Sequence, residues 1–165
     1  MSRKVFLDMD GVLVDFDGYF VKNFGVSYNS LHKADAWKHV EGIPNFFRKL
    51  PPLPNALRLF EKVSLMVKEP AHLEILTAKP KRTGHLLTCA MDKESWIRRH
   101  ISKDIFINCV DGWDNKKHFC QVNDILIDDS ARNCEDWERA GGIAILYNND
   151  DVDNVLTILH KHWHK

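Results

Sequence analysis

The sequence predicts an α/β fold in which a parallel β-sheet lies between two layers of helices, with a small helical cap inserted after the first strand. Short apolar runs alternate with helical patterns along most of the chain, as βα units require. One interval, 18–53, has no strand pattern and interrupts this alternation. The length of 165 residues suits one compact domain that can bury a real core.

The elements follow from the periodicity of apolar residues. Five apolar segments are predicted as strands: 4–8, 72–77, 105–110, 124–128 and 142–146. Six segments are predicted as helices: 17–24, 55–67, 93–100, 116–121, 132–140 and 152–162. Gly141 and Gly142 are expected to end the fifth helix and begin the last strand.

The interval without a strand is rich in aromatic residues and ends in the stiff connector Pro51-Pro52-Leu53-Pro54. Ligands bind parallel sheets at the carboxyl edge, which the chain reaches at the end of its first strand. We therefore expect residues 18–53 to form a cap over that edge, and residues 1–17 and 54–165 to form the core.

The amino-acid composition limits the kinds of molecule that the protein is expected to bind. Lysine plus arginine and aspartate plus glutamate both number 23, so no net field recruits a membrane or strong nucleic-acid binding. The N-terminus lacks a signal-peptide pattern, and no segment is long and apolar enough to cross a bilayer. The four cysteines form no Cys-x-x-Cys pair, which disfavours a zinc site. These features predict a cytoplasmic protein and leave its oligomeric state open.

Two carboxylates stand at the end of the first apolar strand. Asp8 and Asp10 are two residues apart, so they project to the same side of an extended chain. Buried carboxylates need a cation or a hydrogen-bonding partner, since leaving them unpaired is costly. This pair can bind a hard cation such as Mg²⁺ through oxygen, and one of the two can attack phosphorus.

Further polar residues fall at the ends of other predicted strands. Thr77 ends the second strand, and Asp128 and Asp129 end the fourth. Lys116 and Lys117 lie on the segment that leads into that fourth strand. Parallel topology would bring all of these to one crevice. Metal-binding carboxylates and a cation in one place suit phosphoryl transfer, because the phosphate is anionic and repels nucleophiles.

The residue types suggest a role for each position. Asp8 would attack phosphorus and form an aspartyl-phosphate, and Asp10 would act as general acid and then general base. Thr77 would hold a phosphoryl oxygen, and a lysine would neutralise the charge on the transferred group. The metal site would comprise Asp8 and Asp10, completed by Asp128 or Asp129.

These motifs resemble, in chain order, the four motifs of the haloacid dehalogenase (HAD) superfamily of phosphatases. More narrowly, segment 8–16, the Phe46-Phe47…Leu53-Pro54 cap exit and segment 126–129 look like the deoxyribonucleotidase, or C-type 5′-nucleotidase, branch. The resemblance implies a Rossmann-like HAD core and Mg²⁺-dependent removal of phosphate from nucleoside monophosphates. It implies that Asp8 is the nucleophile, and that Asp10 is the acid/base and also offers a backbone carbonyl to the metal.

Two details separate this chain from the family pattern. The threonine of the family is usually followed by Ser-Pro, whereas Ala78-Lys79-Pro80 follows Thr77 here. Lys116 and Lys117 both lie near the spacing of the family's lysine. We favour Lys116, because Phe119 three residues later can anchor that helix face, and keep Lys117 as a substrate-binding candidate.

Three more residues are candidates for binding the substrate. Lys79 either meets the phosphate or belongs to a solvated basic loop. Phe46 and Phe47 either form the core of the cap or place a ring in the crevice, where it would stack on a nucleobase.

The sequence thus predicts a small-molecule phosphomonoester as substrate, in the first place a nucleoside or deoxynucleoside 5′-monophosphate. A phosphatase acting on polynucleotide ends and one acting on small sugar phosphates are the alternatives with the same chemistry. A module that binds metal or phosphate without turnover is an alternative of a different class.

Overall fold

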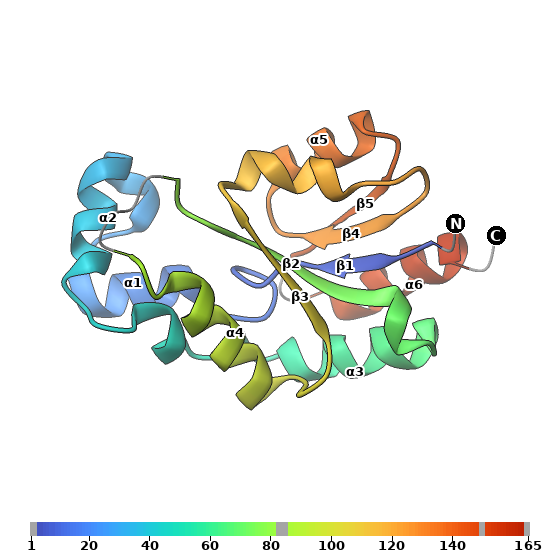
Figure 1. Cartoon of the computed structure of the whole chain (residues 1–165), viewed down its shortest axis with the longest axis horizontal. Helices are drawn as coiled ribbons and strands as arrows, with labels where there is room; N and C mark the ends of the chain where they lie inside the picture. The colour runs from blue at the N-terminus through green and yellow to red at the C-terminus, as the bar shows by residue number, and fades with distance from the viewer. Residues whose placement is uncertain (1–2, 82–85, 149–150, 164–165) are drawn as a thin grey trace.

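A computed structural model describes residues 3–81, 86–148 and 151–163 of the chain. At its centre is a parallel sheet of five strands in the order β3-β2-β1-β4-β5 (Figure 1). The strands are β1 (Val5–Leu7), β2 (Leu73–Lys79), β3 (Phe106–Asp111), β4 (Ile125–Asp128) and β5 (Ile143–Leu146). Each of them overlaps one of the predicted strands, and the predicted fold class is confirmed.

Helices cover both faces of the sheet. The α-helices are α1 (Phe16–Phe24), α2 (Lys33–Glu41), α3 (Ala56–Val67), α4 (Cys89–His100), α5 (Ala131–Arg139) and α6 (Val152–Trp163). Helices α3, α4 and α6 pack on one face, and α5 packs on the other together with the 3₁₀ segment η4 (Trp113–Phe119). Three shorter 3₁₀ turns are η1 (Tyr28–Ser30), η2 (Phe46–Lys49) and η3 (Pro70–His72).

The alternation of side chains along the strands produces one core on each face. On β1, Leu7 enters the larger core beneath α3, α4 and α6, while Phe6 enters the smaller one. There Phe6 meets the ring of Trp137 from α5 at 5.4 Å in an edge-to-face contact. The Trp137 indole N–H donates to the backbone oxygen of Asp124 at 3.0 Å, which fixes α5 against the sheet.

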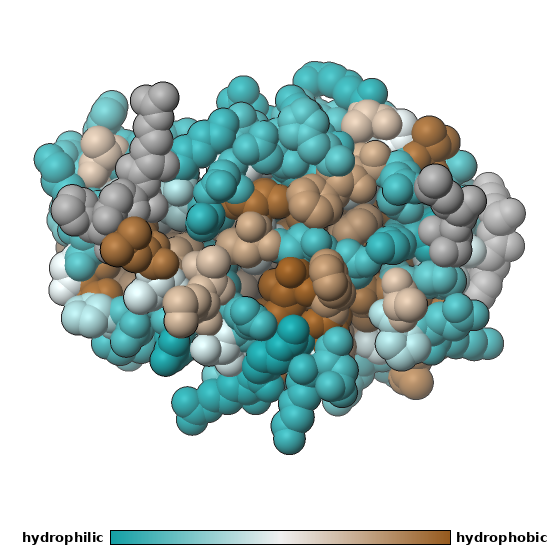
Figure 2. Space-filling view, in the orientation of Figure 1, coloured by the Kyte–Doolittle hydropathy of each residue, from teal (hydrophilic) through white to brown (hydrophobic). Residues whose placement is uncertain are grey.

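The face of the molecule in Figure 2 is mostly polar, with apolar residues near its middle and a few toward its edges. Strand β3 forms one edge of the sheet, and its Phe106 is exposed. Within the described part of the chain, no helix combines the length and the apolar character needed to cross a bilayer.

Two helix predictions need correction. The segment predicted as helix 116–121 forms the 3₁₀ segment η4 instead, which begins after Gly112 at a φ of 78°. Helix α4 begins at Cys89 rather than at residue 93. Its first turn was hidden because Asp92 and Lys93 are polar yet buried, so they interrupt the apolar periodicity.

Between β1 and α3 the structure contains helices α1 and α2 and the turns η1 and η2. They lie at the left of Figure 1, beyond the carboxyl ends of the strands. Asp15 caps α1 by accepting from the Gly18 N–H at 2.9 Å, which is the role expected of a residue at this position. The division into a core and a cap at residues 18 and 53 stays a prediction.

Candidate active site

The register of the sheet brings the first two acidic motifs together. Leu7 of β1 lies opposite Ile127 of β4, so the residues that follow them, Asp8 and Asp128, are neighbours across the two central strands. The Asp8 N–H donates to the Ile127 backbone oxygen at 2.9 Å and continues the ladder by one residue. Both carboxylates are buried at the carboxyl edge. A parallel pairing therefore converts two distant sequence motifs into one acidic cluster.

A tight turn after β1 positions Asp10. The Met9 backbone oxygen accepts from the N–H groups of Leu13 and Val14 at 2.8 and 3.0 Å. Gly11 has a φ of 75°, in the left-handed region that favours glycine. The turn reverses the chain and leaves Asp10 in the lining of the cleft described below.

Lys116 lies between the two buried carboxylates. Its Nζ is 2.7 Å from Asp8 Oδ1 and 2.7 Å from Asp128 Oδ2, and the residue is buried. Burial alone would lower the lysine pKa, but the attraction of Asp8 and Asp128 outweighs it and raises the pKa of Lys116 above the ordinary value of 10.5. The side chain is therefore a fixed cation at neutral pH.

The ionised form of Asp8 remains unfavourable in spite of this lysine. Burial and the neighbouring Asp128 raise the Asp8 pKa well above the ordinary value of 3.8, and Lys116 opposes the effect only in part. The Met9 N–H, at 2.7 Å from Asp8 Oδ1, also supports the carboxylate. A further positive charge near Asp8 would stabilise the ionised carboxylate.

The donors present fit a divalent cation. Carboxylate oxygens of Asp8, Asp128 and Asp129 lie within 4.8 Å of one another, the one such acidic group in the described part of the chain. Partial burial and the nearby Asp128 raise the Asp129 pKa to about 7. With Asp10, four carboxylates face two ammonium groups, Lys116 and Lys93, so the negative charges exceed the positive ones by two when all four carboxylates are ionised. Hard oxygen ligands with that charge excess suit Mg²⁺.

Asn133 orients Asp128. Its side-chain N–H₂ donates to both carboxylate oxygens of Asp128, at 3.1 and 3.0 Å, from the first turn of α5. The Ser130 N–H adds a third hydrogen bond at 2.9 Å to Asp128 Oδ1. With Lys116 on its other oxygen, Asp128 is held on every side. Asp129 has a hydrogen bond from its own backbone but is not held by a lysine or an asparagine as Asp128 is, so it is the more adaptable of the pair.

A second buried lysine, Lys93, projects from α4 to the other carboxylate of the first motif. Its Nζ lies 2.5 Å from Asp10 Oδ2, 2.9 Å from Thr77 Oγ1 and 2.8 Å from the Ala78 backbone oxygen. Burial alone would lower the pKa of Lys93, yet the negative charge of Asp10 raises it overall. Sequence reasoning missed this residue.

These groups lie in the floor of a cleft of about 970 Å³ at the carboxyl edge of the sheet, with Asp8, Asp10 and Lys116 in its lining. Four aromatic residues form its wall on the side of α1 and α2: Phe16, Tyr28, Trp37 and Phe47. The rings of Phe16 and Phe47 are 6.2 Å apart, and those of Tyr28 and Trp37 are 5.3 Å apart. Burial, reinforced by Asp17, raises the Tyr28 pKa, so its hydroxyl remains a hydrogen-bond donor.

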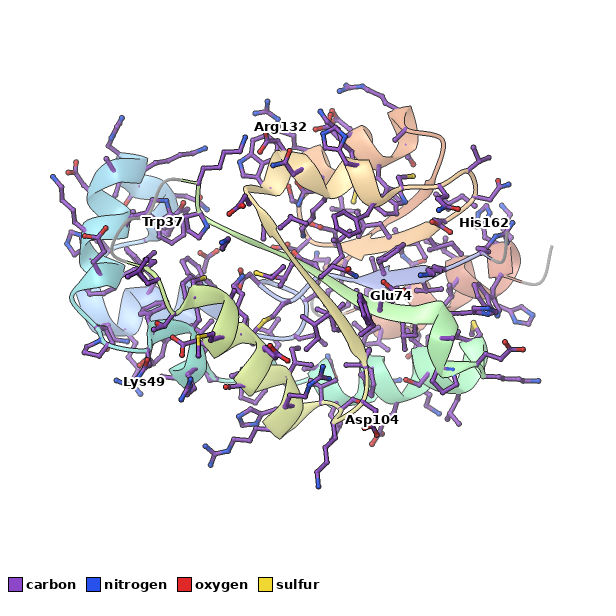
Figure 3. The ribbon with its side chains drawn as sticks, in the orientation of Figure 1. Trp37, Lys49, Glu74, Asp104, Arg132 and His162 are labelled. Carbon is purple, nitrogen blue, oxygen red and sulfur yellow. The ribbon has the colours of Figure 1, made fainter. Side chains whose placement is uncertain are left out.

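The opposite wall is polar. Lys79 and Lys81 line it, and their amino groups pair with Asp111 at 3.1 Å and Asp114 at 2.6 Å. Trp113 also lines it, beneath the guanidinium of Arg132 at 4.4 Å. Figure 3 labels Trp37 on the α2 side and Arg132 at the start of α5, on the two sides of this edge of the sheet. The cleft therefore offers an aromatic side and a charged side around one acidic floor.

Most of the predicted site residues line the cleft or lie directly beneath it, and two lie outside it. Asp8, Asp10, Lys79, Phe47, Lys116 and Asp129 line the cleft. Asp128 supports it from below, and Thr77 is fully buried beside Lys93. The expectation that Phe46 and Lys117 contact substrate does not fit their placement. Phe46 and Phe47 are equally buried, but only Phe47 lines the cleft, and the Phe46 ring packs 5.2 Å from Tyr19. Lys117 is exposed outside the lining of the cleft.

Asp10 differs from the prediction in one respect. Its carboxylate pairs with Lys93 and does not belong to the group of Asp8, Asp128 and Asp129. The departure from the family's serine places Ala78, which has no side-chain donor, in the lining of the cleft. Asn133 and Lys93 carried no motif of their own. The one available signal for Lys93 was a lysine on the face of α4 that otherwise carries Trp96 and Ile97.

The parallel sheet, the aspartate pair at its carboxyl edge and the buried lysine are compatible with a hydrolase of phosphoric monoesters built on a Rossmann-like α/β core, the class to which the family match assigns the chain. The chain belongs to the family described as 5′ nucleotidase, deoxy (Pyrimidine), cytosolic type C protein, whose model matches residues 26–163. This match confirms the predicted resemblance to the deoxyribonucleotidase branch. It begins after Asp8 and Asp10, so the placement of these two residues comes from the structure alone.

Individual relatives are distant. The chain is 24% identical to a protein of Acanthamoeba polyphaga mimivirus named "Putative 5′(3′)-deoxyribonucleotidase", over 96% of this chain and 76% of that protein. A solved hydrolase from Streptococcus pneumoniae aligns with 96% of this chain and 98% of its own, at 14% identity and a TM-score of 0.49. A HAD family enzyme from Bacteroides thetaiotaomicron, in complex with magnesium and inorganic phosphate, aligns with 92% of this chain and 96% of its own, at 14% identity and a TM-score of 0.46.

Proposed function

We propose that this chain removes the phosphate group from nucleoside or deoxynucleoside 5′-monophosphates, with Mg²⁺ as cofactor and Asp8 as nucleophile. The observation that supports it best is the position of Asp8. Its carboxylate lies in the floor of the cleft, is held by Lys116 at 2.7 Å, and belongs to the acidic group suited to a divalent cation. The aromatic wall belongs to the same cleft as Asp8, so in this proposal it covers a planar base while the phosphate meets the floor.

In the proposed reaction, an Asp8 carboxylate oxygen attacks phosphorus as the bond to the leaving 5′ oxygen breaks. Asp10, which must be protonated when it acts at this step, transfers its proton to that oxygen and the nucleoside departs. Asp10, now ionised, takes a proton from water, whose oxygen attacks phosphorus and breaks the bond to Asp8. Phosphate is released and Asp10 is protonated again.

The other residues of the site stabilise charge and geometry in this scheme. Lys116 compensates the negative charge that develops on the transferred group, because its ammonium is fixed beside Asp8. Thr77 acts from beneath the cleft in this scheme, because it is fully buried outside the lining and its hydroxyl oxygen accepts from Lys93. Lys79, at the polar wall, attracts the phosphate as it enters. Mg²⁺, held by Asp8, Asp128 and Asp129, would screen the negative charge of the phosphate and polarise it.

We also propose that the protein acts in the cytoplasm. The description of its family names a cytosolic protein. All four cysteines are free thiols in the structure, which is compatible with a reducing compartment.

The experiment is a measurement of phosphate release from a substrate panel, in Mg²⁺ and in EDTA. The panel contains ribo- and deoxyribonucleoside monophosphates, ribose 5-phosphate and an oligonucleotide with a 5′-terminal phosphate. We expect turnover of 5′-monophosphates that is lost in EDTA. Preference for the oligonucleotide or the sugar phosphate would replace the proposed substrate, and the lack of metal-dependent turnover of any of them would refute the proposal.

The Asp8→Asn variant tests the nucleophile. It keeps the size of the side chain but removes the attacking oxygen, so we expect a loss of turnover of at least about 10³-fold with an unchanged circular dichroism spectrum. Asp35→Asn is the matched control, since Asp35 is exposed on α2 and pairs only loosely with Lys38 at 3.5 Å. Full turnover by Asp8→Asn would contradict the assigned role.

A further inference from the structure

The proposed chemistry does not use Lys93, although this lysine is fully buried and lies beside the acid/base residue. Its ammonium group carries three N–H bonds and meets three acceptors: Asp10 Oδ2, Thr77 Oγ1 and the Ala78 backbone oxygen. The ring of Phe47 lies over the same ammonium, with its centroid 5.0 Å away. A buried lysine whose three N–H donors all have acceptors is held in one conformation.

Direct contact between Lys93 and a substrate is excluded by this arrangement. The residue is not in the lining of the cleft, and each of its donors already has an acceptor within the protein. Lys116, in contrast, lines the cleft and lies beside the proposed nucleophile. The two buried lysines therefore serve different carboxylates.

The consequence for Asp10 is a fixed orientation. One oxygen, Oδ2, is held by Lys93 at 2.5 Å. The other, Oδ1, is buried and has no hydrogen-bond partner among the described residues, although Asp10 lines the cleft. A buried acceptor without a partner is costly unless a ligand or water engages it. With Oδ2 held by Lys93, the carboxyl group cannot rotate freely, so the part of it that is exposed to the cleft keeps one orientation.

We propose that Lys93 is the positioning residue of the acid/base step, which acts by holding the Asp10 carboxyl group in line with the leaving oxygen. The inference rests on the proposed function, because it assigns a partner to the acid of that reaction. The same ammonium also holds Thr77, so Asp10 and the end of strand β2 share one support.

The test compares two classes of phosphate ester by kcat/KM, which reports the steps through phosphoryl transfer. An alkyl phosphate, such as an active nucleoside monophosphate, needs a proton on its leaving oxygen, whereas p-nitrophenyl phosphate leaves as a stable anion. A misplacement of about 1 Å costs on the order of 10²-fold in rate. We therefore expect Lys93→Met to lower kcat/KM about 10²-fold for the alkyl ester and only a few-fold for the aryl ester.

Lys116→Met is the matched control, because it removes the other buried ammonium and should lower kcat/KM for both esters alike. The double variant Asp10→Asn/Lys93→Met removes both members of the ion pair, so no buried charge is left unpaired and folding is preserved. If Lys93 acts through Asp10, the double variant is no slower on the alkyl ester than Asp10→Asn alone. Equal losses of Lys93→Met on both esters, or additive losses in the double variant, would overturn the inference.

A crystal structure of Lys93→Met gives a readout that needs no activity. We expect the Asp10 carboxyl group to turn away from the position that it occupies beside Lys93 in the unaltered chain. An unchanged Asp10 would overturn the inference even if the unaltered chain hydrolysed no phosphate ester. Lack of hydrolysis by the unaltered chain would refute the proposed function separately.

Discussion

Asp129 occupies the space that a side chain on Gly11 would need: a Cβ atom built on Gly11 would lie 2.0 Å from Asp129 Oδ2. The two residues belong to motifs that are 118 positions apart in the chain. Gly11 therefore does more than adopt a φ of 75°, because its lack of a side chain allows the two acidic motifs to approach each other.

Replacement of Gly11 by alanine should disturb the metal site as well as the turn. The positive φ costs a non-glycine residue about 1–2 kcal/mol, and the new methyl group would also displace the Asp129 carboxylate. We expect Gly11→Ala to lower Mg²⁺ affinity and turnover at least about tenfold. Gly25→Ala is the control, because Gly25 has a φ of 72° but nothing within 4 Å of the added methyl group. Titration with Mg²⁺ measures the difference, and equal effects of the two variants on affinity would contradict the proposed contact.

Of the two neighbouring lysines of η4, only Lys116 should be sensitive to substitution. Lys116→Met removes the ammonium between Asp8 and Asp128 and leaves two buried carboxylates facing each other. Breaking a buried pair in this way costs about 3–5 kcal/mol, so both turnover and melting temperature should fall. Lys117→Met changes an exposed side chain and should leave kcat and KM within about twofold. Steady-state kinetics and thermal melts of the two variants decide between them, and loss of turnover in Lys117→Met would exchange their roles.

The acidic group should make metal-free stability fall as the pH rises. The Asp129 pKa is about 7 in the folded chain against an ordinary value of 3.8, so the folded state retains a proton that the unfolded state has lost between these values. Stability from this group is thus present at low pH and is lost as the pH rises toward 7. We expect the melting temperature in EDTA to decrease from pH 5 to pH 8.

Mg²⁺ should reverse this trend, because the cation binds ionised carboxylates and competes with protons. The increase in melting temperature on adding Mg²⁺ should be larger at pH 8 than at pH 5. Asp129→Asn isolates the effect from other titrating groups: it should flatten the profile in EDTA and reduce the response to Mg²⁺. A response to Mg²⁺ that is independent of pH, or unchanged in Asp129→Asn, would count against a metal site at this residue.

Phe47 should matter for substrates that carry a base. A base that stacks fully on an aromatic side chain gains about 1–3 kcal/mol, but Phe47 is only 2% exposed and offers a base part of its ring, so Phe47→Leu should raise KM for a nucleoside monophosphate a few-fold. The KM for ribose 5-phosphate, which has no base, should change much less. Phe46→Leu is the matched control, since its ring is buried outside the cleft and should affect melting temperature more than KM. Similar changes of KM for both substrates in Phe47→Leu would argue against stacking.

The elements that sequence analysis predicted well are those with an uninterrupted apolar pattern. Strands β1, β2 and β4 and helix α3 differ from prediction by one or two residues at their ends. The start of α4 was missed because its inner face carries Asp92 and Lys93, which a hydrophobic pattern places at the surface. The predicted helix 116–121 is the 3₁₀ segment η4, because the sequence indicates a short helical stretch but does not distinguish the hydrogen-bond pattern of a 3₁₀ helix from that of an α-helix.

The same contrast applies to the candidate site. Asp8, Asp10, Asp128 and Asp129 were recognisable because each pair of acids follows an apolar strand, which is an unusual place for charge. The choice between Lys116 and Lys117 depended on which way a short turn faces, and between Phe46 and Phe47 on which ring reaches the cleft. Side-chain direction in such short segments is set by packing against distant residues.

The sequence by itself determined the parallel α/β architecture and the acidic carboxyl edge, because apolar periodicity and the residues that end each strand are local properties. Only the tertiary structure decided that Lys116 holds Asp8, that Lys93 holds Asp10 and that Gly11 makes room for Asp129. These contacts join residues that are 83 to 118 positions apart in the chain. They depend on strand register and helix packing, which bring together groups that no local pattern connects.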